Sequence, residues 1–478
     1  MRASERTAVL DANAAHLGVD TAQLMENAGA GVARSVEGHR GGDDVVVLAG
    51  RGNNGGDALV AARFLEDLDP TVLLLGRRET VASDLTRRNL DVLVASETEP
   101  TEVRDATELP VDAIASADAV VDGMLGTGVA GALREPVRSA VEATNDCDGT
   151  VVSVDVPSGA DPDVPPGSTD GTVVDADAVV TFHEWKPCHE GLDADVTVVD
   201  IGIPDAAWTF VGPGDVALLD RDPASHKGEN GTVTVVGGGP YAGAPALAGL
   251  AALRAGADLA RVVVPERVAD AVQGYAPDLI VHDLPGDRLR PEHVDRVRDV
   301  VERSDVAVVG PGMSGADETV EAVETLAGDL DRAVLDAEAI GAVDALPRDA
   351  DAMVTPHAGE LAPHVEEVPD GWRERRDVVR GFAADRGVTA LLKGRYDVVS
   401  DGDDVRVGRT GNPGMTVGGT GDVLAGVCGS LLATREPFHA ACVAAHVNGR
   451  AGDLAADDAG FGLLASDVVE RLPAAISE

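Results

Sequence analysis

Lysine, cysteine and long apolar runs are scarce in this chain of 478 residues. The cysteines lie far apart with no Cys-x-x-Cys pair, so neither a disulfide framework nor a zinc site is expected of Cys147, Cys188, Cys428 and Cys442. No run of about 18 apolar residues occurs, which argues against a transmembrane helix. The first residues, Met1-Arg-Ala-Ser-Glu-Arg, lack the apolar core of a signal peptide, and we therefore expect a cytoplasmic protein.

Basic residues are also few. The chain has 38 Lys and Arg residues and 83 Asp and Glu residues, which gives a formal net charge of -45. The acidic residues are dispersed along the chain and do not form a tail. A dispersed negative surface repels nucleic acid and anionic membranes, so neither is expected as a partner. High salt screens the repulsion among such charges, and we expect a halophilic protein that works in a salt-rich cytoplasm.

The only lysines are Lys186, Lys227 and Lys393. Lysine offers a compact, mobile ammonium group that arginine does not reproduce. Because the chain otherwise uses arginine, each lysine becomes a candidate for a specific role. Chance retention on the surface is the alternative.

The pattern along the chain predicts an α/β fold in two domains. The 478 residues are long for one hydrophobic core. Apolar runs of strand length, each followed by a Gly-containing turn and a helical segment, recur in both halves and predict largely parallel sheets. A Pro- and Gly-rich stretch interrupts the pattern, so we place the join near 213–222, with domains at 1–215 and 216–478.

In the first half, polar residues follow the ends of several predicted strands. The earliest strand runs into the Gly-rich turn Gly50–Asp57, and later strands end in Asp122 and in Asp155 with Ser158. Strand, Gly-rich turn and helix form the phosphate-binding arrangement of doubly wound folds, although neither the dinucleotide Gly-x-Gly-x-x-Gly nor an NTPase loop is present. Because the carboxyl ends of parallel strands line one crevice, we expect these oxygens to converge on a hard cation or a sugar-phosphate. For any one acid alone, capping of the next helix is the better interpretation.

In the second half, the Gly-rich stretch Gly408–Gly426 places Asp422 where an apolar helical pattern begins. Glycines let a backbone approach an anion closely, and the N–H groups at a helix start bind it. A phosphate and a reacting hydroxyl would therefore meet beside Asp422. The alternative is an ordinary Gly-rich turn capped by Asp.

These motifs resemble two known families. Through Asn53-Asn-Gly-Gly-Asp57 and Asp155-Val-Pro-Ser-Gly159 the first half resembles the NAD(P)H-hydrate epimerases. Through Thr355-Pro-His357, Leu392-Lys393-Gly394 and Gly418-Gly-Thr-Gly-Asp422 the second half resembles the ADP-dependent NAD(P)H-hydrate dehydratases. The resemblance covers nearly the whole chain. It implies an N-terminal Rossmann-like three-layer sandwich followed by a C-terminal ribokinase-like α/β domain.

The resemblance also implies an activity, the repair of hydrated nicotinamide dinucleotides. The R and S epimers of NADHX and NADPHX would be interconverted, and the S epimer would be dehydrated at the expense of ADP, which gives AMP and phosphate. Asp155 would be the acid/base of the epimerase and Asp422 the base of the dehydratase. K+ would be bound by Asn54, Asp122 and Ser158, and Mg2+ would accompany ADP. The partners are then small-molecule substrates, and a homo-oligomer is expected.

The binding residues carry over position by position from the family motifs. In the first half, the hydrated dinucleotide would be held by Asn53, Asn54, Gly55, Gly56, Asp57, Gly126, Thr127, Gly128, Val129, Ala130, Gly131, Ala132 and Asp155. In the second half, it would contact Ala244, Gly312, His357 and Asp422. The adenosine nucleotide would contact Lys393, Gly394, Arg395, Tyr396, Asp397 and Gly421.

Two rival interpretations stay open at this point. A ribokinase-like small-molecule kinase, fused to a non-catalytic nucleotide-binding module, would place its base where Asp422 lies. The first half could instead be a binding module, as in mRNA-decapping scaffold proteins, but the joint presence of Asn54, Asp122 and Asp155 weighs against this. The segment around Lys186 is longer before its glycine than the family pattern, which leaves the role of this lysine open.

Overall fold

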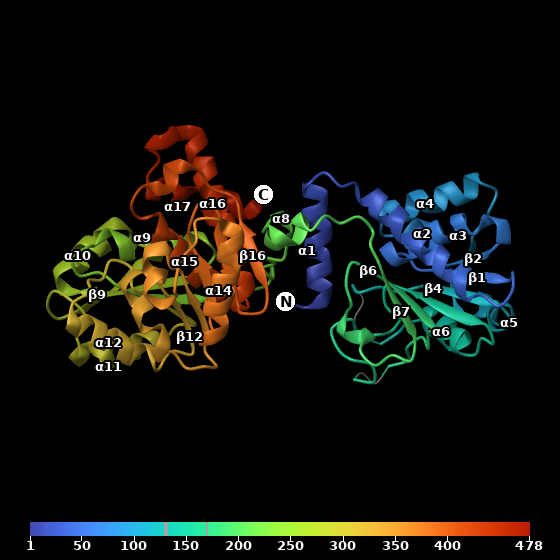
Figure 1. The fold of residues 1–478 in the computed structure, drawn as a ribbon, viewed down its shortest axis with the longest axis horizontal. Coiled ribbons are helices and arrows are strands. Elements are labelled where there is room, and N and C mark those ends of the chain that lie inside the picture. The colour runs from blue at the N-terminus through green and yellow to red at the C-terminus, as the bar shows by residue number, and fades with distance from the viewer. Residues whose placement is uncertain (129–131, 169–170) are drawn as a thin grey trace. The chain divides into compact units, whose positions relative to one another are not determined.

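The computed structural model describes residues 1–128, 132–168 and 171–478, and it divides into two compact units (Figure 1). The N-terminal unit is Met1–Asp205 and the C-terminal unit is Ala206–Glu478. The division falls earlier in the chain than the expected join at 213–222. The reason is that the intervening segment belongs to the second sheet, since Phe210 pairs with Val407 as a parallel bridge.

The N-terminal unit is built on a parallel sheet of seven strands in the order β3-β2-β1-β4-β5-β6-β7. Apolar β-branched runs that are buried on both faces favour such strands, and every side chain of β1 is buried. The strands are β1 (Val45–Ala49), β2 (Thr71–Leu75), β3 (Thr101–Val103), β4 (Ala119–Gly123), β5 (Thr150–Val154), β6 (Ala178–Phe182) and β7 (Asp195–Val199).

Helices cover both faces of this sheet. Alternate strand residues pack with Val32, Leu59 and Leu90 on one face and with Ile114 and Val141 on the other. The helices are α1 (Ala3–His16), α2 (Thr21–His39), α3 (Asn53–Phe64), α4 (Asp84–Ala95), α5 (Val111–Ala115) and α6 (Val137–Asn145). With α2, α3 and α4 on one face and α5 and α6 on the other, the predicted Rossmann-like three-layer sandwich is confirmed.

The C-terminal unit contains a sheet of nine strands in the order β10-β9-β8-β11-β12-β13-β14-β15-β16. The strands pair in parallel from β10 to β14, and β15 and β16 add an antiparallel edge. They are β8 (Thr232–Val236), β9 (Leu259–Pro265), β10 (Leu279–Leu284), β11 (Val306–Val309), β12 (Arg332–Leu335), β13 (Asp351–Val354), β14 (Thr389–Leu392), β15 (Asp397–Ser400) and β16 (Val405–Gly408).

Helices again form layers on both sides of this second sheet. One core joins α9, α15, α16 and α17 to the sheet, and the other joins α11, α12 and α14. The helices are α7 (Ala206–Thr209), α8 (Pro213–Ala217), α9 (Gly243–Arg254), α10 (Glu266–Tyr275), α11 (Val294–Val301), α12 (Asp317–Ala327), α13 (Ala358–Leu361), α14 (Trp372–Arg386), α15 (Thr420–Leu432), α16 (Pro437–Ala459) and α17 (Ala465–Ser477). Within the described ranges, we find no helix with the length and apolar character needed to cross a membrane.

Candidate active sites

In the N-terminal unit, the polar residues expected at the strand ends lie at one edge of the sheet. Strand order reverses between β1 and β4, where open α/β sheets form their ligand crevice. Asn53 and Asn54 begin α3 shortly after β1, Asp122 lies in β4, and Asp155 directly follows β5. The convergence follows from the parallel topology, since each strand delivers its last residues to the same edge.

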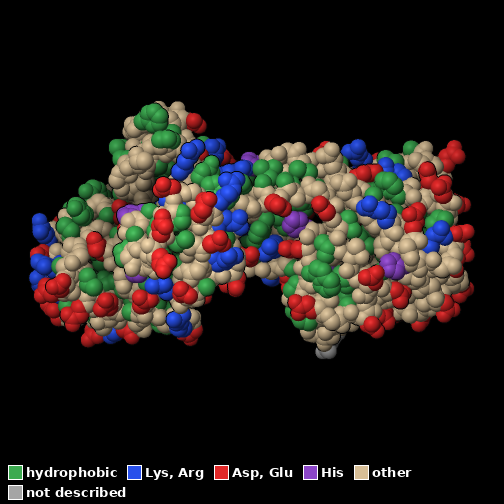
Figure 2. Space-filling model, in the orientation of Figure 1, with side chains coloured by type: hydrophobic (Ala, Val, Ile, Leu, Met, Phe, Trp, Pro, Cys, Tyr) green, Lys and Arg blue, Asp and Glu red, His purple; other side chains and the backbone are tan. Residues whose placement is uncertain are grey.

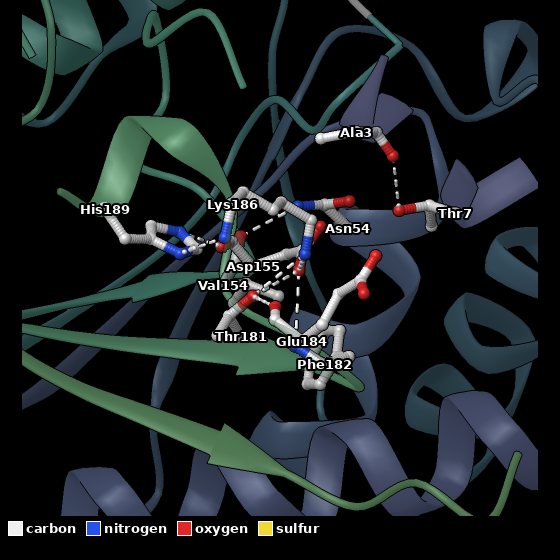
Figure 3. A network of polar contacts seen from close by, with 10 residues as sticks. All are labelled: Ala3, Thr7, Asn54, Val154, Asp155, Thr181, Phe182, Glu184, Lys186 and His189. Atoms are coloured by element: carbon white, nitrogen blue, oxygen red, sulfur yellow. Dashed lines mark hydrogen bonds and ion pairs between the residues drawn. The ribbon is translucent and has the colours of Figure 1, made fainter. Parts of the chain in front are cut away.

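Asp155 and Lys186 form a buried ion pair, shown in Figure 3. Lys186 Nζ lies 2.6 Å from Asp155 Oδ1, and the two side chains are 2% and 8% exposed respectively. The Thr181 hydroxyl donates to the same oxygen at 3.0 Å and accepts from Lys186 Nζ at 2.9 Å. Among the described residues, every hydrogen bond to this carboxylate ends on Oδ1, so Oδ2 remains as the oxygen that can exchange a proton with a ligand.

His189 holds the main chain around this ion pair. Its Nε2 lies 3.0 Å from Asp155 O, and its Nδ1 lies 3.1 Å from Lys186 N. Burial and the Lys186 ammonium lower the pKa of His189, so the neutral ring donates from Nε2 and accepts at Nδ1. Asp155 has a φ of 65°, a left-handed conformation that few non-glycine residues adopt. One histidine thus fixes the backbone of both members of the pair and supports this conformation.

Two further carboxyl groups, Asp11 and Asp57, lie within electrostatic reach of Asp155. Burial, and then the charge of Asp155, raises the pKa of Asp11 to about 6. Burial, with the charges of Asp155 and Asp11, raises the pKa of Asp57 well above its usual range. The site thus brings two carboxyl groups with raised pKa values, Asp11 and Asp57, close to the Asp155–Lys186 ion pair.

Helix α1, which carries Asp11, is tied to the loops around the ion pair. Ser4 Oγ donates to Asp163 at 3.1 Å, and Arg6 Nε lies 2.9 Å from Glu184 Oε1. Glu184 stands two residues before Lys186 in the segment that Figure 3 shows around Asp155. The N-terminal helix is therefore part of the site, which the sequence patterns did not indicate.

Asp122, Ser158 and Asn54 form a second polar group next to Asp155. The Asp122 carboxylate is fully buried and accepts hydrogen bonds from Ser153 Oγ and Ser158 N, each at 2.8 Å, and from Ser158 Oγ. Asn54 Nδ2 donates to Val154 O at 2.8 Å. Burial raises the pKa of Asp122, and the bonds from Ser158 and Ser153 oppose that rise.

The turn after β4 lies against the start of α3. A Cβ atom at Gly126 would come within 2.2 Å of Asn54 Oδ1, so a side chain here would displace that of Asn54 from its bond to Val154 O. Thr127, Gly128 and Ala132 belong to the same turn, while Val129, Ala130 and Gly131 lie outside the described residues. At the start of this turn, Leu125 N donates to Ser158 Oγ at 2.9 Å. In the α3 motif, Asn53 is exposed, whereas Gly55, Gly56 and Asp57 are buried.

In the C-terminal unit, Lys393 joins several acidic residues at the carboxyl ends of the strands. Its Nζ lies 2.8 Å from Asp336 Oδ1 and 3.8 Å from Glu360 Oε2. The Thr355 hydroxyl also donates to Asp336 Oδ1, at 2.7 Å. Although burial opposes the charged form, the carboxylates of Asp336 and Glu360 raise the pKa of Lys393. A permanent ammonium is thereby held in the crevice.

Asp422 lies in the first turn of α15, beside this ammonium. Burial and the charge of Asp336 raise the pKa of Asp422 to about 6, while Lys393 opposes the rise. A Cβ at Gly421 would stand 3.5 Å from Lys393 Nζ, so the helix start and the lysine are in contact range. The helix is capped by Gly419 at φ 101°, a conformation that favours glycine. The N-terminus of α15, the Lys393 ammonium and the Asp422 carboxyl group, whose pKa is about 6, thus lie beside one another.

The other residues expected to contact the hydrate lie around the same crevice edge. A Cβ at Gly312 would stand 3.0 Å from Ala244 Cβ, which places these two residues against each other after β11 and β8. His357 forms a parallel bridge with Lys393. Its exposed ring caps α13, because Nδ1 accepts from Gly359 N at 3.0 Å and from Glu360 N at 3.1 Å.

The segment Lys393–Asp397, expected to bind the nucleotide, forms the turn between β14 and β15. Gly394 N donates to Asp397 Oδ1 at 2.9 Å, which closes the turn. Burial raises the pKa of Asp397 to about 7, against the effect of that bond and of Lys393. Arg395 is exposed and Tyr396 is half-buried.

Sequence reasoning missed Asp11 and Asp336 as members of these sites. Asp336 ends a predicted strand, and the rule applied to the first half, that an acid at a strand end faces the crevice, would have found it. Asp11 has no such signal, because it lies within a helix and reaches the site only through packing.

Comparison with known proteins agrees with this division. Residues 233–474 match the family model described as NAD(P)H-hydrate dehydratase, and residues 21–188 match the model described as the YjeF-related protein N-terminus. A solved ADP/ATP-dependent NAD(P)H-hydrate dehydratase from Bacillus subtilis, co-crystallised with ATP/Mg2+, is 28% identical with a TM-score of 0.50, over 56% of this chain and 97% of that chain.

Full-length relatives are similar over both units. The bifunctional NAD(P)H-hydrate repair enzyme of Archaeoglobus fulgidus is 42% identical over 98% of this chain and 97% of its own. That of Pyrobaculum aerophilum is 44% identical over 98% of this chain and 96% of its own. Since family models match both units and these relatives are similar over nearly the whole chain, the chain belongs to the family of bifunctional NAD(P)H-hydrate repair enzymes.

Proposed function

We propose that this chain repairs hydrated nicotinamide dinucleotides. The N-terminal unit interconverts the R and S epimers of NADHX and NADPHX, and the C-terminal unit dehydrates the S epimer with ADP. One observation carries the proposal beyond family membership. Lys186 and Lys393, two of the chain's only three lysines, each form an ion pair in a strand-end crevice, one with Asp155 and the other beside Asp422.

In the epimerase unit, Asp155 moves the proton that accompanies inversion at C6 of the hydrate. Lys186 and Thr181 hold Oδ1, which leaves Oδ2 to face the ligand. The hydrated ring and its phosphates are bound by the Asn53–Asp57 turn and by the 126–132 turn. Asp57, whose pKa is raised by burial, supplies a second carboxyl group close to Asp155 that can act as the acid in this proton transfer.

Asn54, Asp122 and Ser158 would hold K+ beside the epimerase site. Their side chains offer only oxygen ligands for a hard cation, which fits its chemistry. The buried Asp122 carboxylate accepts hydrogen bonds from the hydroxyl groups of Ser153 and Ser158. When bound, the ion would supply positive charge for the substrate's phosphates. An increase in the unfolding temperature of the N-terminal unit with K+, absent with Asp122→Asn, would support the site.

In the dehydratase unit, Asp422 takes the proton of the C6 hydroxyl of the S hydrate. That oxygen attacks the β-phosphorus of ADP, the bond to the α-phosphate oxygen breaks, and AMP leaves. Phosphate then departs from C6 with the bonding electrons as C5 loses a proton, which restores the dihydronicotinamide ring. Lys393 and the N–H groups at the start of α15 stabilise the charge on the transferring phosphoryl group.

The adenosine nucleotide contacts the Lys393–Asp397 turn and Gly421. Mg2+ enters with the nucleotide, as the ATP/Mg2+ complex of the Bacillus subtilis dehydratase suggests. Among the described residues, no group of three or more His, Cys, Asp or Glu side chains is arranged to hold a metal ion, so the phosphates themselves would supply most of its ligands.

The protein is further proposed to act in a salt-rich cytoplasm as a homo-oligomer. The net charge of -45 supports a salt-rich cytoplasm, because salt screens the repulsion among the acidic side chains and so stabilises the folded chain. The exposed apolar side chains of Phe461 and Leu464 are compatible with a contact between copies. Light scattering in molar KCl measures the assembly directly.

The central experiment incubates a mixture of R- and S-NADHX with the full chain and follows the absorbance of restored NADH. With ADP, both epimers are expected to convert completely, and without ADP none converts. A stable phosphate ester in place of NADH would instead identify a small-molecule kinase. Conversion of only half the mixture would show that the N-terminal unit is not an epimerase.

A further inference from the structure

In the N-terminal unit, the carboxylate of Asp155 is held through one of its two oxygens. Lys186 Nζ donates to Oδ1 at 2.6 Å, and the Thr181 hydroxyl donates to the same atom at 3.0 Å (Figure 3). Asp155 directly follows β5, and Thr181 lies in β6, the neighbouring parallel strand. Oδ2 is left for the proton that the proposed epimerisation moves. We name this arrangement of an acid, a threonine and a lysine the Asp–Thr–Lys triad.

The C-terminal unit contains a second Asp–Thr–Lys triad with the same connections. Lys393 Nζ donates to Asp336 Oδ1 at 2.8 Å, and the Thr355 hydroxyl donates to that oxygen at 2.7 Å. Asp336, Thr355 and Lys393 directly follow β12, β13 and β14, which are neighbours in the parallel sheet. Among the described residues, no hydrogen bond ends on Asp336 Oδ2. Two donors thus again fix one carboxylate oxygen and leave the other unbound.

The acids of the two triads differ from most acids of this chain. Figure 2 shows many Asp and Glu side chains on the visible surface of both units. The side chains of Asp155 and Asp336 are instead only 8% and 3% exposed, and each is paired with one of the chain's three lysines. Removing two charges from water can cost more than their attraction returns, so stability alone does not account for this burial. The repetition of the triad at two strand-end crevices indicates a chemical role.

The main chain of Asp336 lies against the turn that carries Gly312, which is proposed to contact the hydrate. A Cβ at Gly310 would stand 1.8 Å from Asp336 O, so the two segments touch at this point. The next residue, Ala337, has a φ of 50°, a left-handed conformation that few non-glycine residues adopt. The charge of Asp336 is also one cause of the raised pKa of Asp422, so the two carboxyl groups lie within electrostatic reach of each other.

The dehydration needs a second proton acceptor beside Asp422. Asp422 is proposed to take the proton of the C6 hydroxyl, and the restored double bond requires that C5 also lose a proton. Glu360, another carboxylate near Lys393, has both oxygens engaged. Its Oε2 accepts from His357 N at 2.7 Å, and its Oε1 lies 3.5 Å from His357 Nε2. That leaves Asp336, with its unbound Oδ2, as the second acceptor.

We propose that Asp336 is the base that takes the C5 proton in the dehydration, through Oδ2, while Lys393 and Thr355 hold Oδ1. The inference rests on the proposed function of the C-terminal unit. After phosphoryl transfer to the C6 oxygen, the C6–O bond breaks and its electrons leave with phosphate. The C5–H electrons form the bond between C5 and C6, and Asp336 Oδ2 receives the proton. Each triad then presents one carboxylate oxygen for a proton transfer at the hydrated ring.

The test follows a single turnover of S-NADHX with ADP on the full chain and measures AMP and NADH separately. In Asp336→Asn, NADH formation should fall by at least about 100-fold, as on loss of a general base. AMP should still form in the first turnover, because Asp422 and Lys393 remain, so the phosphorylated hydrate should accumulate. With substrate deuterated at C5, the isotope effect on NADH formation should exceed that of the wild type. Asp331→Asn, the same change at an exposed acid just before β12, is the matched control.

The outcomes separate a base from a structural role. If Asp336 only positions Lys393, Asp336→Asn will slow AMP and NADH formation equally without accumulation of the phosphorylated hydrate, which overturns the inference while the proposed function stands. If the leaving phosphate takes the C5 proton, NADH will follow AMP as fast as in the wild type, and the inference is also wrong. Asp336→Glu keeps a charge beside Lys393 but shifts the oxygens by one methylene, and it should show the same accumulation if Asp336→Asn fails to fold. A wild type that forms neither AMP nor NADH overturns both the inference and the proposed function.

Discussion

Replacing Asp422 with Asn is expected to abolish dehydration and, at neutral pH, to stabilise the C-terminal unit. Burial and the neighbouring Asp336 raise the pKa of Asp422 from 3.8 to about 6. At about 1.4 kcal/mol per pKa unit, keeping this carboxylate ionised in the folded protein costs roughly 3 kcal/mol. Because the side chain is only half-buried, solvent screening reduces the expected gain from Asn to about 1–2 kcal/mol.

The gain depends on pH in a defined direction. The pKa of Asp422 is higher in the folded than in the unfolded protein, so the protonated carboxyl group stabilises the wild type, and this stabilisation is complete below about pH 4. It is lost as the pH rises through about 6. The free energy of unfolding of Asp422→Asn should therefore equal that of the wild type near pH 4 and exceed it above pH 6.

Calorimetric unfolding of the full chain at constant high salt, at pH 4 and pH 7, measures this difference. For a unit of this size, about 1–2 kcal/mol corresponds to a shift of roughly 2–8 °C in the midpoint. Dehydration of S-NADHX should fall by at least about 100-fold, as expected on removal of a general base. Asp403→Asn, an exposed carboxylate between β15 and β16, is the control. A wild-type dehydration rate, or the same midpoint shift at both pH values, would refute the reasoning.

Three further predictions follow from the N-terminal unit and the surface. Asp155→Asn should stop epimerisation and leave R-NADHX behind, and it should lower the free energy of unfolding by about 3–5 kcal/mol because Lys186 is then buried and unpaired. The double variant Asp155→Asn/Lys186→Met should recover the stability but not the epimerisation. Recovery of both would contradict the role of Asp155. Asp11→Asn removes a charge that raises the pKa of Asp57. The alkaline limb of the epimerisation pH–rate profile, where Asp57 loses its proton, should therefore move to lower pH while dehydration is unaffected. An unmoved profile would exclude Asp11 from the site. The free energy of unfolding should rise from low to molar salt as the net charge of -45 is screened, and equal stability in both would argue against a salt-adapted surface.

Local sequence patterns were sufficient for the architecture of both units. Runs such as Val45–Ala49 and Val306–Val309 are apolar throughout, and only strands buried on both faces of a parallel sheet require this composition. The position of Asp422 at a helix start was also predictable, because the change from glycine to an apolar helical period marks that boundary.

The chemical environment of the side chains depended on tertiary structure. Asp155 and Lys186 are 31 residues apart, and no periodicity indicates that β5 and the loop after β6 bring them to 2.6 Å. The pairing of Lys393 with Asp336, 57 residues away, depends likewise on strand order. Asp11 reaches its site only because α1 packs beside it.

The sequence by itself therefore determined which residue types stand at the ends of the strands and that the chain consists of two α/β halves. Only the tertiary structure decided which carboxyl groups are paired with lysine and which are buried without a cation. That difference sets whether a carboxyl is ionised at neutral pH, since burial and neighbouring charge act through space over a few ångströms and leave no trace in local sequence spacing.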